Sequence, residues 1–257
     1  MALINNDEIR DFVEKNIQTF HDKRLEKLRA LQLKTVLHRK NPYLFRAKNL
    51  TVAADLVKSL LDAFLSSQEE ESFGHFLEEL AIFVCQRVYG GRKSTLVGID
   101  LEFEREDIYY IVSIKSGPSW GNSDQINRML SNFDSLITLL QEQHSTIIAV
   151  NGCCYGRDTK PYKIGKLKMN RSVVKEIPYY KFCGQEFWSF VSGIDSMYVD
   201  IVEPMGYQAK LKNDAFWKAY SQILNRFTIE FSQQFCTADG SIDWEHLVAL
   251  SSARIPT

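Results

Sequence analysis

The chain has 257 residues, 45% of them hydrophobic and 25% charged, which is the composition of an ordinary globular protein. This composition excludes disordered, collagen-like and coiled-coil proteins, and the length predicts one large domain or a catalytic domain with a smaller helical partner. The formal net charge is −1, with 31 Lys and Arg against 32 Asp and Glu, so attraction to a polyanion must come from local clusters of cations.

Cysteine spacing and the N-terminal sequence bear on where the protein works. The five cysteines form no Cys-x-x-Cys motif and no Cys/His spacing typical of a zinc site, which predicts free thiols in a reducing compartment. The N-terminal residues have neither the basic nor the apolar region of a secretion signal, and no apolar run is long enough to cross a membrane. We therefore expect a cytoplasmic protein without a membrane partner.

Helical periodicity dominates the first part of the chain. Apolar residues recur at three- and four-residue steps from about 6 to 38, which predicts one long helix or two. Asn41-Pro42 interrupts this pattern, because a residue before proline avoids the helical conformation, and 43–48 is predicted to be an ordered connector. Two further helices are predicted, one over 51–66 and one over 69–88.

After these helices the period of the apolar residues changes to two. The segments 96–104 and 108–115 alternate in this way, which predicts a β-hairpin with its turn at 105–107. A helix over 122–143 and a buried strand over 146–150 are predicted to follow. The order strand, strand, helix, strand predicts an α/β fold with a mixed β-sheet flanked by helices.

The remaining segments are predicted to complete this fold. A basic stretch, a short strand and three helices are predicted, in that order, over 160–175, 179–182, 185–191, 214–235 and 242–251. The boundary between two regions is predicted near residue 68. It separates an N-terminal helical region, 1–67, from the domain that contains the sheet, 68–257.

The predicted hairpin brings an acid and a lysine together. Its turn is predicted between Glu106 and Asp107. This register places Asp100 opposite Ser113, with Lys115 two residues further along the same face. A carboxylate and an ammonium group are therefore expected to share one solvent-exposed edge.

Two more acids follow on the same strand. Because side chains alternate along a strand, Glu102 and Glu104 are predicted on the face of Asp100, and the apolar residues between them point into the core. Three carboxylates in a row repel one another unless a cation or solvent intervenes, and Mg²⁺ favours such oxygen ligands. The alternative is a hairpin whose polar face is solvated and has no role.

The residues around the hairpin resemble those of a known nuclease superfamily. GIDLEF at 98–103 and IVSIKSG at 111–117 resemble the paired strands of PD-(D/E)XK nucleases, in which an aspartate begins one strand and an acid-x-lysine lies on the next. Further blocks resemble one group of dimeric type II restriction endonucleases: NPYLFRAKN at 41–49, SFG at 72–74 with EE at 78–79, SGPSWGN at 116–122, GQEFW at 184–188 and ADG at 238–240. Together these blocks extend over nearly the whole chain.

The resemblance implies a fold, an activity and partners. That group reads interrupted, GC-rich palindromes of the GGNCC type. The resemblance therefore implies Mg²⁺-dependent hydrolysis of phosphodiester bonds in double-stranded DNA at a palindromic site. A restriction-endonuclease-like sheet and a homodimer are also implied, with 1–67 as a candidate dimerisation element. A cognate DNA methyltransferase is expected in the cell, but not as a stable complex.

The resemblance also implies roles for site residues. Asp100 matches the metal-binding aspartate of the family and Lys115 its catalytic lysine. Mg²⁺ is then expected to bind Asp100 and the main-chain carbonyl of Ile114, while Lys115 orients water and offsets negative charge. Ser113 is a departure, because the superfamily pattern has Glu or Asp at that position, although several relatives have Ser-x-Lys.

Another carboxylate is needed where Ser113 replaces the acid. The candidates are Glu79, Glu78 and Glu102. Glu79 is favoured, because the superfamily often brings a glutamate from the helix before the hairpin toward the metal. The alternative is that acids on an amphipathic helix form a solvated face without a role in catalysis.

Clustered cations and two polar residues are predicted to contact DNA. The cations are Arg46, Lys48, Lys160, Lys163, Lys166, Lys168 and Arg171. We expect them to attract phosphates, and the alternative for each is a role in solubility. Asn122 and Gln125 are further candidates, and Gln125 is expected to position a phosphate or the nucleophile unless it is a helix-surface residue with no role.

Two other functions stay open at this point. A repair or recombination nuclease of the same superfamily would act on ends, flaps or single strands. A non-catalytic DNA-binding protein with a decayed site is the other alternative, prompted by Ser113 in the acid position. Metal-dependent cleavage of any DNA would reject the second alternative, and discrete fragments from a plasmid would argue against the first.

Overall fold

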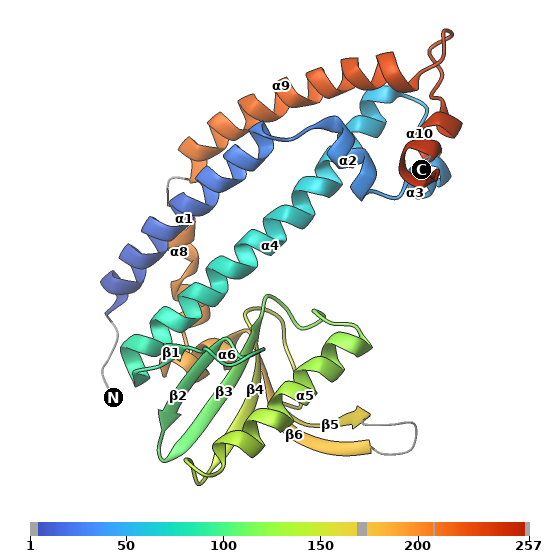
Figure 1. Cartoon of the computed structure of the whole chain (residues 1–257). Helices are drawn as coiled ribbons and strands as arrows, with labels where there is room; N and C mark the ends of the chain where they lie inside the picture. The colour runs from blue at the N-terminus through green and yellow to red at the C-terminus, as the bar shows by residue number, and fades with distance from the viewer. Residues whose placement is uncertain (1–4, 169–173, 208, 255–257) are drawn as a thin grey trace. The chain divides into compact units, whose positions relative to one another are not determined.

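The computed structural model describes residues 5–168, 174–207 and 209–254, which form two compact units (Figure 1). The sheet unit consists of the described residues within Met1–Ile17 and Gly74–Tyr207. The helical unit consists of those within Gln18–Phe73 and Gln208–Thr257. The predicted boundary near residue 68 falls close to the break at Phe73. The described residues up to Ile17, however, belong to the sheet unit, and the C-terminal segment from 209 belongs to the helical unit.

Six helices supply the helical unit, and two of them continue into the sheet unit. They are α1 (Asn6–Arg29), α2 (Leu33–Arg39), α3 (Pro42–Ala47), α4 (Ala53–Tyr89), α9 (Ala209–Phe235) and α10 (Trp244–Ser252). Large apolar side chains from α4 and α9, among them Leu56, Leu61, Phe227 and Phe231, form the buried core of this unit. No helix among the described residues is both long enough and apolar enough to span a membrane.

Two predictions in this region differ from the structure. The predicted connector after Asn41 is the short helix α3, because the Asn41 side chain accepts a hydrogen bond from Tyr43 N at 3.0 Å and Pro42 is suited to a first helical turn. The two helices predicted over 51–66 and 69–88 are one helix, α4. Near the predicted junction, the hydroxyls of Ser67 and Ser72 donate to carbonyls one turn back, and residues 67–68 include no glycine or proline to end the helix.

The sheet has six strands in the order β1-β2-β3-β4-β6-β5 and confirms the predicted mixed α/β fold. The strands are β1 (Arg92–Lys93), β2 (Leu101–Arg105), β3 (Ile108–Lys115), β4 (Ile147–Cys153), β5 (Tyr162–Lys168) and β6 (Val174–Cys183). β3, β4 and β6 are parallel to one another, whereas β1, β2 and β5 pair antiparallel with their neighbours. The short strand predicted at 179–182 is therefore part of a longer strand, and the basic stretch contributes the edge strand β5.

The β2–β3 hairpin has the predicted register. Glu106 and Asp107 both have positive φ, 55° and 60°, which matches the two-residue turn that suits the twist of paired strands. Leu101 consequently pairs with Val112, and Asp100 directly precedes this pair. The predicted first strand, over 96–104, was too long at its N-terminal end, because the chain turns there through a hydrogen bond from Ile99 N to Leu96 O.

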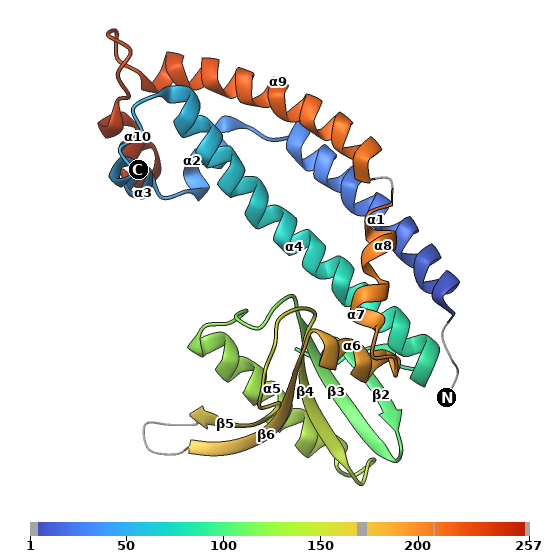
Figure 2. The ribbon, with the colours of Figure 1, turned by 180° about the vertical axis from the view of Figure 1, so that it is seen from behind.

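Helices cover both faces of the sheet (Figures 1 and 2). On one face, α5 (Ser123–Leu140) buries Leu130 and Phe133 against Ile111 of β3. On the other face, Phe190 of α6 (Gln185–Ser192) packs against Phe103 with ring centroids 5.3 Å apart. Two short helices that the sequence did not predict, α7 (Met197–Asp200) and α8 (Val202–Met205), follow α6.

The close packing of α6 on the sheet gives a test of this fold. Gly152 of β4 lies beneath Phe187, and a Cβ added to Gly152 would lie only 2.2 Å from the Phe187 ring. We expect Gly152→Ala to lower the free energy of unfolding by about 1–3 kcal/mol, as overpacking does in other cores. Urea unfolding followed by circular dichroism would measure the change.

The same substitution in α4 provides a control of opposite sign. A Cβ added to Gly74 would lie 3.6 Å from Cβ of Ser116, which is an ordinary van der Waals distance. Alanine also loses less backbone entropy than glycine in a helix interior, so Gly74→Ala is expected to stabilise the protein by about 0.5–1 kcal/mol. Equal effects of the two alanines would contradict the packing described for Gly152.

Candidate active site

Asp100 and Lys115 meet where β3 ends. Lys115 is the last residue of β3, and its Nζ lies 3.6 Å from Oδ2 of Asp100. The main chain of Ile114 joins the two groups, because its N–H donates to Asp100 Oδ2 at 2.6 Å and its carbonyl accepts from Lys115 Nζ at 2.9 Å. The hairpin therefore places a carboxylate, a main-chain carbonyl and an ammonium group side by side.

Both charged side chains are partly open to solvent. The Lys115 side chain is 28% exposed and that of Asp100 is 24% exposed. Such partial burial strengthens electrostatic interactions with an incoming ligand and still leaves the ligand a way in. Oxygen donors beside a fixed cation are able to hold a divalent metal and a phosphate together.

Ser113 lies inside the sheet, two residues before Lys115. Its exposed fraction is 2%, and its carbonyl accepts a hydrogen bond from Nδ2 of Asn151 at 3.3 Å. A serine at this position brings no negative charge to the site. Any second carboxylate must therefore come from another element.

Glu78 of α4 is one candidate for the second carboxylate. Burial raises the pKa of the Cys154 thiol to about 12, and the negative charge of Glu78 and then that of Asp100 add to this rise. Cys154 follows β4, and its N–H donates to Lys115 O at 2.9 Å. The backbone of Cys154 is therefore hydrogen-bonded to that of Lys115, and the charges of Glu78 and Asp100 both act on its thiol.

The neighbouring acid, Glu79, has a different environment. Gly74 lies one helical turn before Glu78 and packs against Ser116, so this face of α4 points toward the end of β3. Glu79 is the next residue around the helix and is exposed, whereas the Glu78 side chain is only 20% exposed. Lys93 Nζ lies 3.5 Å from Glu78 and pairs with it. Glu78 is thus the more buried of the two candidates and shares the helix face of Gly74, while the role that the resemblance implies for Glu79 stays a prediction.

Glu102 has partners of its own. It is 4% exposed, it accepts a hydrogen bond from the Tyr109 hydroxyl, and Arg92 Nη2 on β1 lies 3.5 Å from it. Burial and this hydrogen bond raise the pKa of Tyr109 to about 12, so the phenol remains a donor at neutral pH. Glu104, in contrast, is exposed. Asp100 and the two acids of β2, Glu102 and Glu104, therefore occupy three different environments and do not form one solvated row.

The available donors suit an open site for a hard cation. Within the described ranges, no three His, Cys, Asp or Glu side chains gather closely enough to enclose a metal ion. Mg²⁺ does not require such a cage, because it keeps several waters and binds through one or two carboxylates together with substrate phosphates. The Asp100 carboxylate, the Ile114 carbonyl and the Glu78 carboxylate fit that requirement.

Asn122 and Gln125 have a structural role at the start of α5. The Asn122 side chain accepts hydrogen bonds from Asp124 N and Gln125 N, and Gln125 Oε1 accepts one from Asn122 N at 3.0 Å. This reciprocal capping satisfies main-chain donors that the first helical turn leaves unpaired. The contact with DNA predicted for these two residues stays a prediction.

The predicted DNA-binding cations fall into separate environments. In the sheet unit, Lys163 Nζ donates to Asp158 at 2.8 Å, while Lys160, Lys166 and Lys168 are exposed. This hydrogen bond holds the pKa of Asp158 below its ordinary value. Arg171 lies outside the described residues.

In the helical unit, the guanidinium carbon of Arg46 lies 5.5 Å from the ring centre of Trp244, and Lys48 Nζ lies 5.3 Å from that of Phe45. Both cations are therefore stacked on aromatic rings in α3 and α10. These contacts hold the cationic groups at the surface.

Trp120 and Asn151 were not predicted as site residues. Lys115 Nζ lies 5.3 Å from the ring centre of Trp120, and Trp120 Nε1 donates to Asn151 Oδ1 at 3.1 Å. Trp120 belongs to the SGPSWGN block that carries part of the resemblance, and this block was the sequence feature that could have identified Trp120 as a site residue. Asn151 gave no signal, because only the pairing of β3 with β4 brings it to Ser113.

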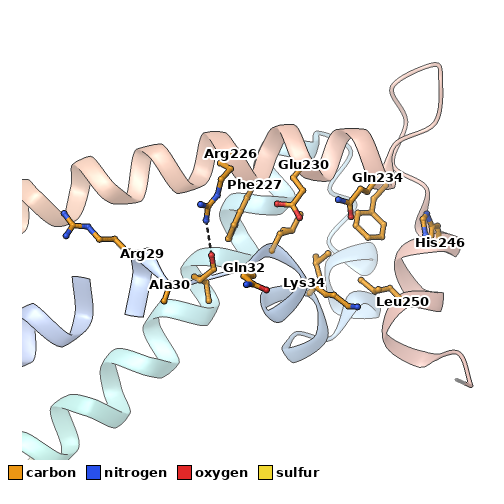
Figure 3. Close-up of a pocket in the computed structure, with 14 residues that line it drawn as sticks. Arg29, Ala30, Gln32, Lys34, Arg226, Phe227, Glu230, Gln234, His246 and Leu250 are labelled. Carbon is orange, nitrogen blue, oxygen red and sulfur yellow. Dashed lines mark hydrogen bonds between the residues drawn. The ribbon is translucent and has the colours of Figure 1, made fainter. Parts of the chain in front are cut away.

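A pocket of about 830 Å³ lies within the helical unit (Figure 3). Its lining combines cations, among them Arg29, Lys34 and Arg226, with apolar side chains and a single carboxylate, Glu230. Arg226 already donates a hydrogen bond to Leu31 O at 3.0 Å. One carboxylate without a paired lysine does not provide the groups that phosphodiester hydrolysis needs, so the hairpin is the stronger candidate for the active site.

Comparison with known proteins identifies the family of the chain. Residues 7–213 match the family model described as "Type II restriction endonuclease EcoO109I". The match covers most of the chain and includes both Asp100 and Lys115. Comparison with curated proteins gave no match. With its mixed sheet and the family match over residues 7–213, the chain belongs to the type II restriction endonuclease EcoO109I family.

Proposed function

We propose that the protein hydrolyses phosphodiester bonds of double-stranded DNA at a palindromic site and that it requires Mg²⁺ for this reaction. The observation that carries the proposal is the pairing of Asp100 with Lys115 across the Ile114 main chain, in a chain of a restriction endonuclease family. The carboxylate and the carbonyl would bind the metal, and Lys115 would act on the phosphate next to that metal.

Asp100, the Ile114 carbonyl and Glu78 are the groups that we assign to the metal. Mg²⁺ bound by them would polarise a phosphate oxygen and lower the pKa of a coordinated water. Asp100 keeps its orientation through the hydrogen bond from Ile114 N. Glu78 would supply the negative charge that Ser113 does not, since a hard cation gains from a second carboxylate.

Lys115 would act directly on the reacting phosphate. Its ammonium is compact, carries three donors and is already directed to the Ile114 carbonyl at 2.9 Å. From that position it would orient the attacking water and offset the negative charge that develops on the phosphate. The Cys154 thiol is not assigned as a general base, because burial raises its pKa and keeps it protonated at neutral pH.

We also propose that two copies of the chain act on one site. Cleavage of both strands of a palindrome needs two active sites related by twofold symmetry, which a homodimer provides. The N-terminal helical region, 1–67, is the candidate dimerisation element, and analytical ultracentrifugation of the full chain would measure the assembly. The sequence blocks described above favour GGNCC-type sites, and a cell that contains this enzyme in its cytoplasm would need a methyltransferase to protect its own DNA.

Digestion of a sequenced plasmid with Mg²⁺, followed by run-off sequencing of the ends, tests the proposed function. Discrete fragments whose ends share one palindrome would support it. Progressive or structure-dependent degradation would instead favour a repair or recombination nuclease. Intact plasmid with either Mg²⁺ or Mn²⁺ would favour a non-catalytic DNA-binding protein.

The exposed cations of β5 give a separate prediction about DNA affinity. Lys166 and Lys168 are exposed on alternate positions of the edge strand and so share one face. Replacing both by alanine is expected to weaken cognate and non-cognate binding alike and to make the slope of log K against log salt less negative by about two. Fluorescence anisotropy at several salt concentrations would measure both effects.

A matched lysine in the neighbouring strand serves as the control. Lys175 of β6 pairs with Asp134 at 2.6 Å, so its charge is already balanced. Lys175→Ala is expected to leave the salt slope unchanged. If the double variant behaves in the same way as Lys175→Ala, the face of β5 that carries Lys166 and Lys168 does not bind phosphates.

A further inference from the structure

The ammonium of Lys115 has a partner besides Asp100 and Ile114. The Trp120 ring lies beneath it, at 5.3 Å from Nζ to the ring centre, which is within the range of a cation–π interaction. Lysine has a flexible four-carbon stem and loses considerable rotamer freedom when it is held in one place. The Asp100 carboxylate and the Ile114 carbonyl contact the Lys115 ammonium, and the Trp120 ring is a third contact that restricts this side chain further.

Trp120 is itself held in one orientation. Its indole N–H donates to Asn151 Oδ1 at 3.1 Å. The loop that carries Trp120 is attached to the sheet at two further points, where Tyr155 N donates to Ser116 O at 3.1 Å and Lys181 Nζ donates to Pro118 O at 2.8 Å. A tryptophan on a loop attached in this way presents its face to Lys115 rather than sampling many positions.

Asn151 connects this ring to the strand of the lysine. It is 2% exposed and stands beside Ser113 in the parallel pairing of β4 with β3. Its Nδ2 donates to Ser113 O at 3.3 Å, while its Oδ1 accepts from Trp120. The indole can only donate and the Ser113 carbonyl can only accept, so the amide has one orientation that satisfies both partners.

We infer that Asn151 and Trp120 form a positioning relay, in which the buried amide orients the indole and the indole face holds the Lys115 ammonium for catalysis. The inference rests on the proposed function, because it assigns the relay to the lysine of that site. Neither Asn151 nor Trp120 is assigned a contact with DNA or with the reacting phosphate, so both are positioning residues. The signature of the relay is a loss in turnover without a loss in DNA binding.

Two substitutions at Trp120 separate the ring face from the N–H group. Trp120→Leu removes the aromatic face, and we expect kcat for a duplex with the cognate site to fall by about 2- to 30-fold, with KM and affinity in Ca²⁺ unchanged. Trp120→Phe keeps a face but loses the bond to Asn151, so its fall in kcat is expected to be smaller. Trp217→Leu, at an exposed tryptophan of α9, is the matched control and is expected to leave kcat unchanged.

A double-mutant cycle tests whether Asn151 acts through Trp120. Asn151→Ala alone is expected to lower kcat, but it should add little in the Trp120→Leu background, because the ring it orients is already absent. If the leucine variant does not fold, the same cycle is measured with Trp120→Phe, where the two losses should again be less than additive. Additive losses in the cycle would overturn the relay.

The outcomes distinguish the relay from the function on which it rests. Cleavage by the wild-type chain with unchanged kcat in Trp120→Leu would overturn the relay and leave the proposed function intact. A loss confined to KM or to binding in Ca²⁺ would mean that Trp120 contacts DNA, and would also overturn the relay. Absence of metal-dependent cleavage by the wild-type chain would reject the proposed function and the relay together.

Discussion

Lys115→Ala is expected to lower kcat for cleavage of cognate DNA by at least about 100-fold, because one preorganised electrostatic group commonly contributes that much to an enzymatic transition state. Asp100→Asn is expected to have a comparable effect. The asparagine keeps an oxygen that can accept the hydrogen bond from Ile114 N but removes the charge that attracts a divalent cation. Cleavage of a labelled duplex in Mg²⁺ would measure both losses.

DNA binding by these variants should survive, since each variant changes one group at a single phosphate and leaves the other predicted phosphate-binding cations in place. Anisotropy in Ca²⁺ would measure it without cleavage. Lys212 and Asp22 form a matched Lys–Asp pair in the helical unit, with 2.7 Å between Nζ and Oδ1, and Lys212→Ala with Asp22→Asn provides the control. Retention of cleavage in Lys115→Ala would remove this lysine from the mechanism, whatever the control shows.

Glu78→Gln is expected to raise the Mg²⁺ concentration for half-maximal cleavage by about 10-fold or more, because it removes the second negative charge that we assign to the metal. Glu79→Gln is expected to leave that concentration unchanged, since Glu79 is exposed on a different face of α4. A Mg²⁺ titration of the cleavage rate with both variants would measure the difference.

The pairing of Glu78 with Lys93 calls for one more control. Lys93→Ala removes the partner 3.5 Å from Glu78 but keeps the carboxylate, so it is not expected to raise the Mg²⁺ requirement. If Lys93→Ala acts as Glu78→Gln does, the effect belongs to the ion pair and not to the metal. If Glu79→Gln raises the Mg²⁺ concentration for half-maximal cleavage more than Glu78→Gln does, the metal-binding carboxylate is Glu79.

Much of the sheet unit was predictable because its signals are local. The alternation of apolar residues along 108–115 defines β3, and the two residues with positive φ, Glu106 and Asp107, permit the tight turn that sets the register. Once the register is known, an acid placed opposite Ser113 and a lysine two residues beyond it must lie close together. The hairpin register alone therefore predicted that Asp100 and Lys115 lie close together.

The length of α4 was less predictable, because nothing in the sequence around 66–72 distinguishes a helix that continues from two helices joined by a turn. Serine and glutamate are tolerated in both. The choice depends on packing over the whole helix, with Leu56 and Leu61 buried in one unit and Leu80 and Val84 buried in the other. Such burial stabilises a continuous helix even where local propensity is weak.

The sequence by itself determined the hairpin, its acid and its lysine, because strand alternation and turn chemistry act over a few residues. Only the tertiary structure gives a reason to assign Glu78 rather than Glu79 to accompany them. Glu78 and Glu79 differ by one step around α4, and the approach of Gly74 to Ser116 selects the face that turns toward β3. The tertiary structure also places Asn151 within hydrogen-bonding distance of Trp120. Parallel strands bring residues that are far apart in the chain side by side, and no local pattern encodes that pairing.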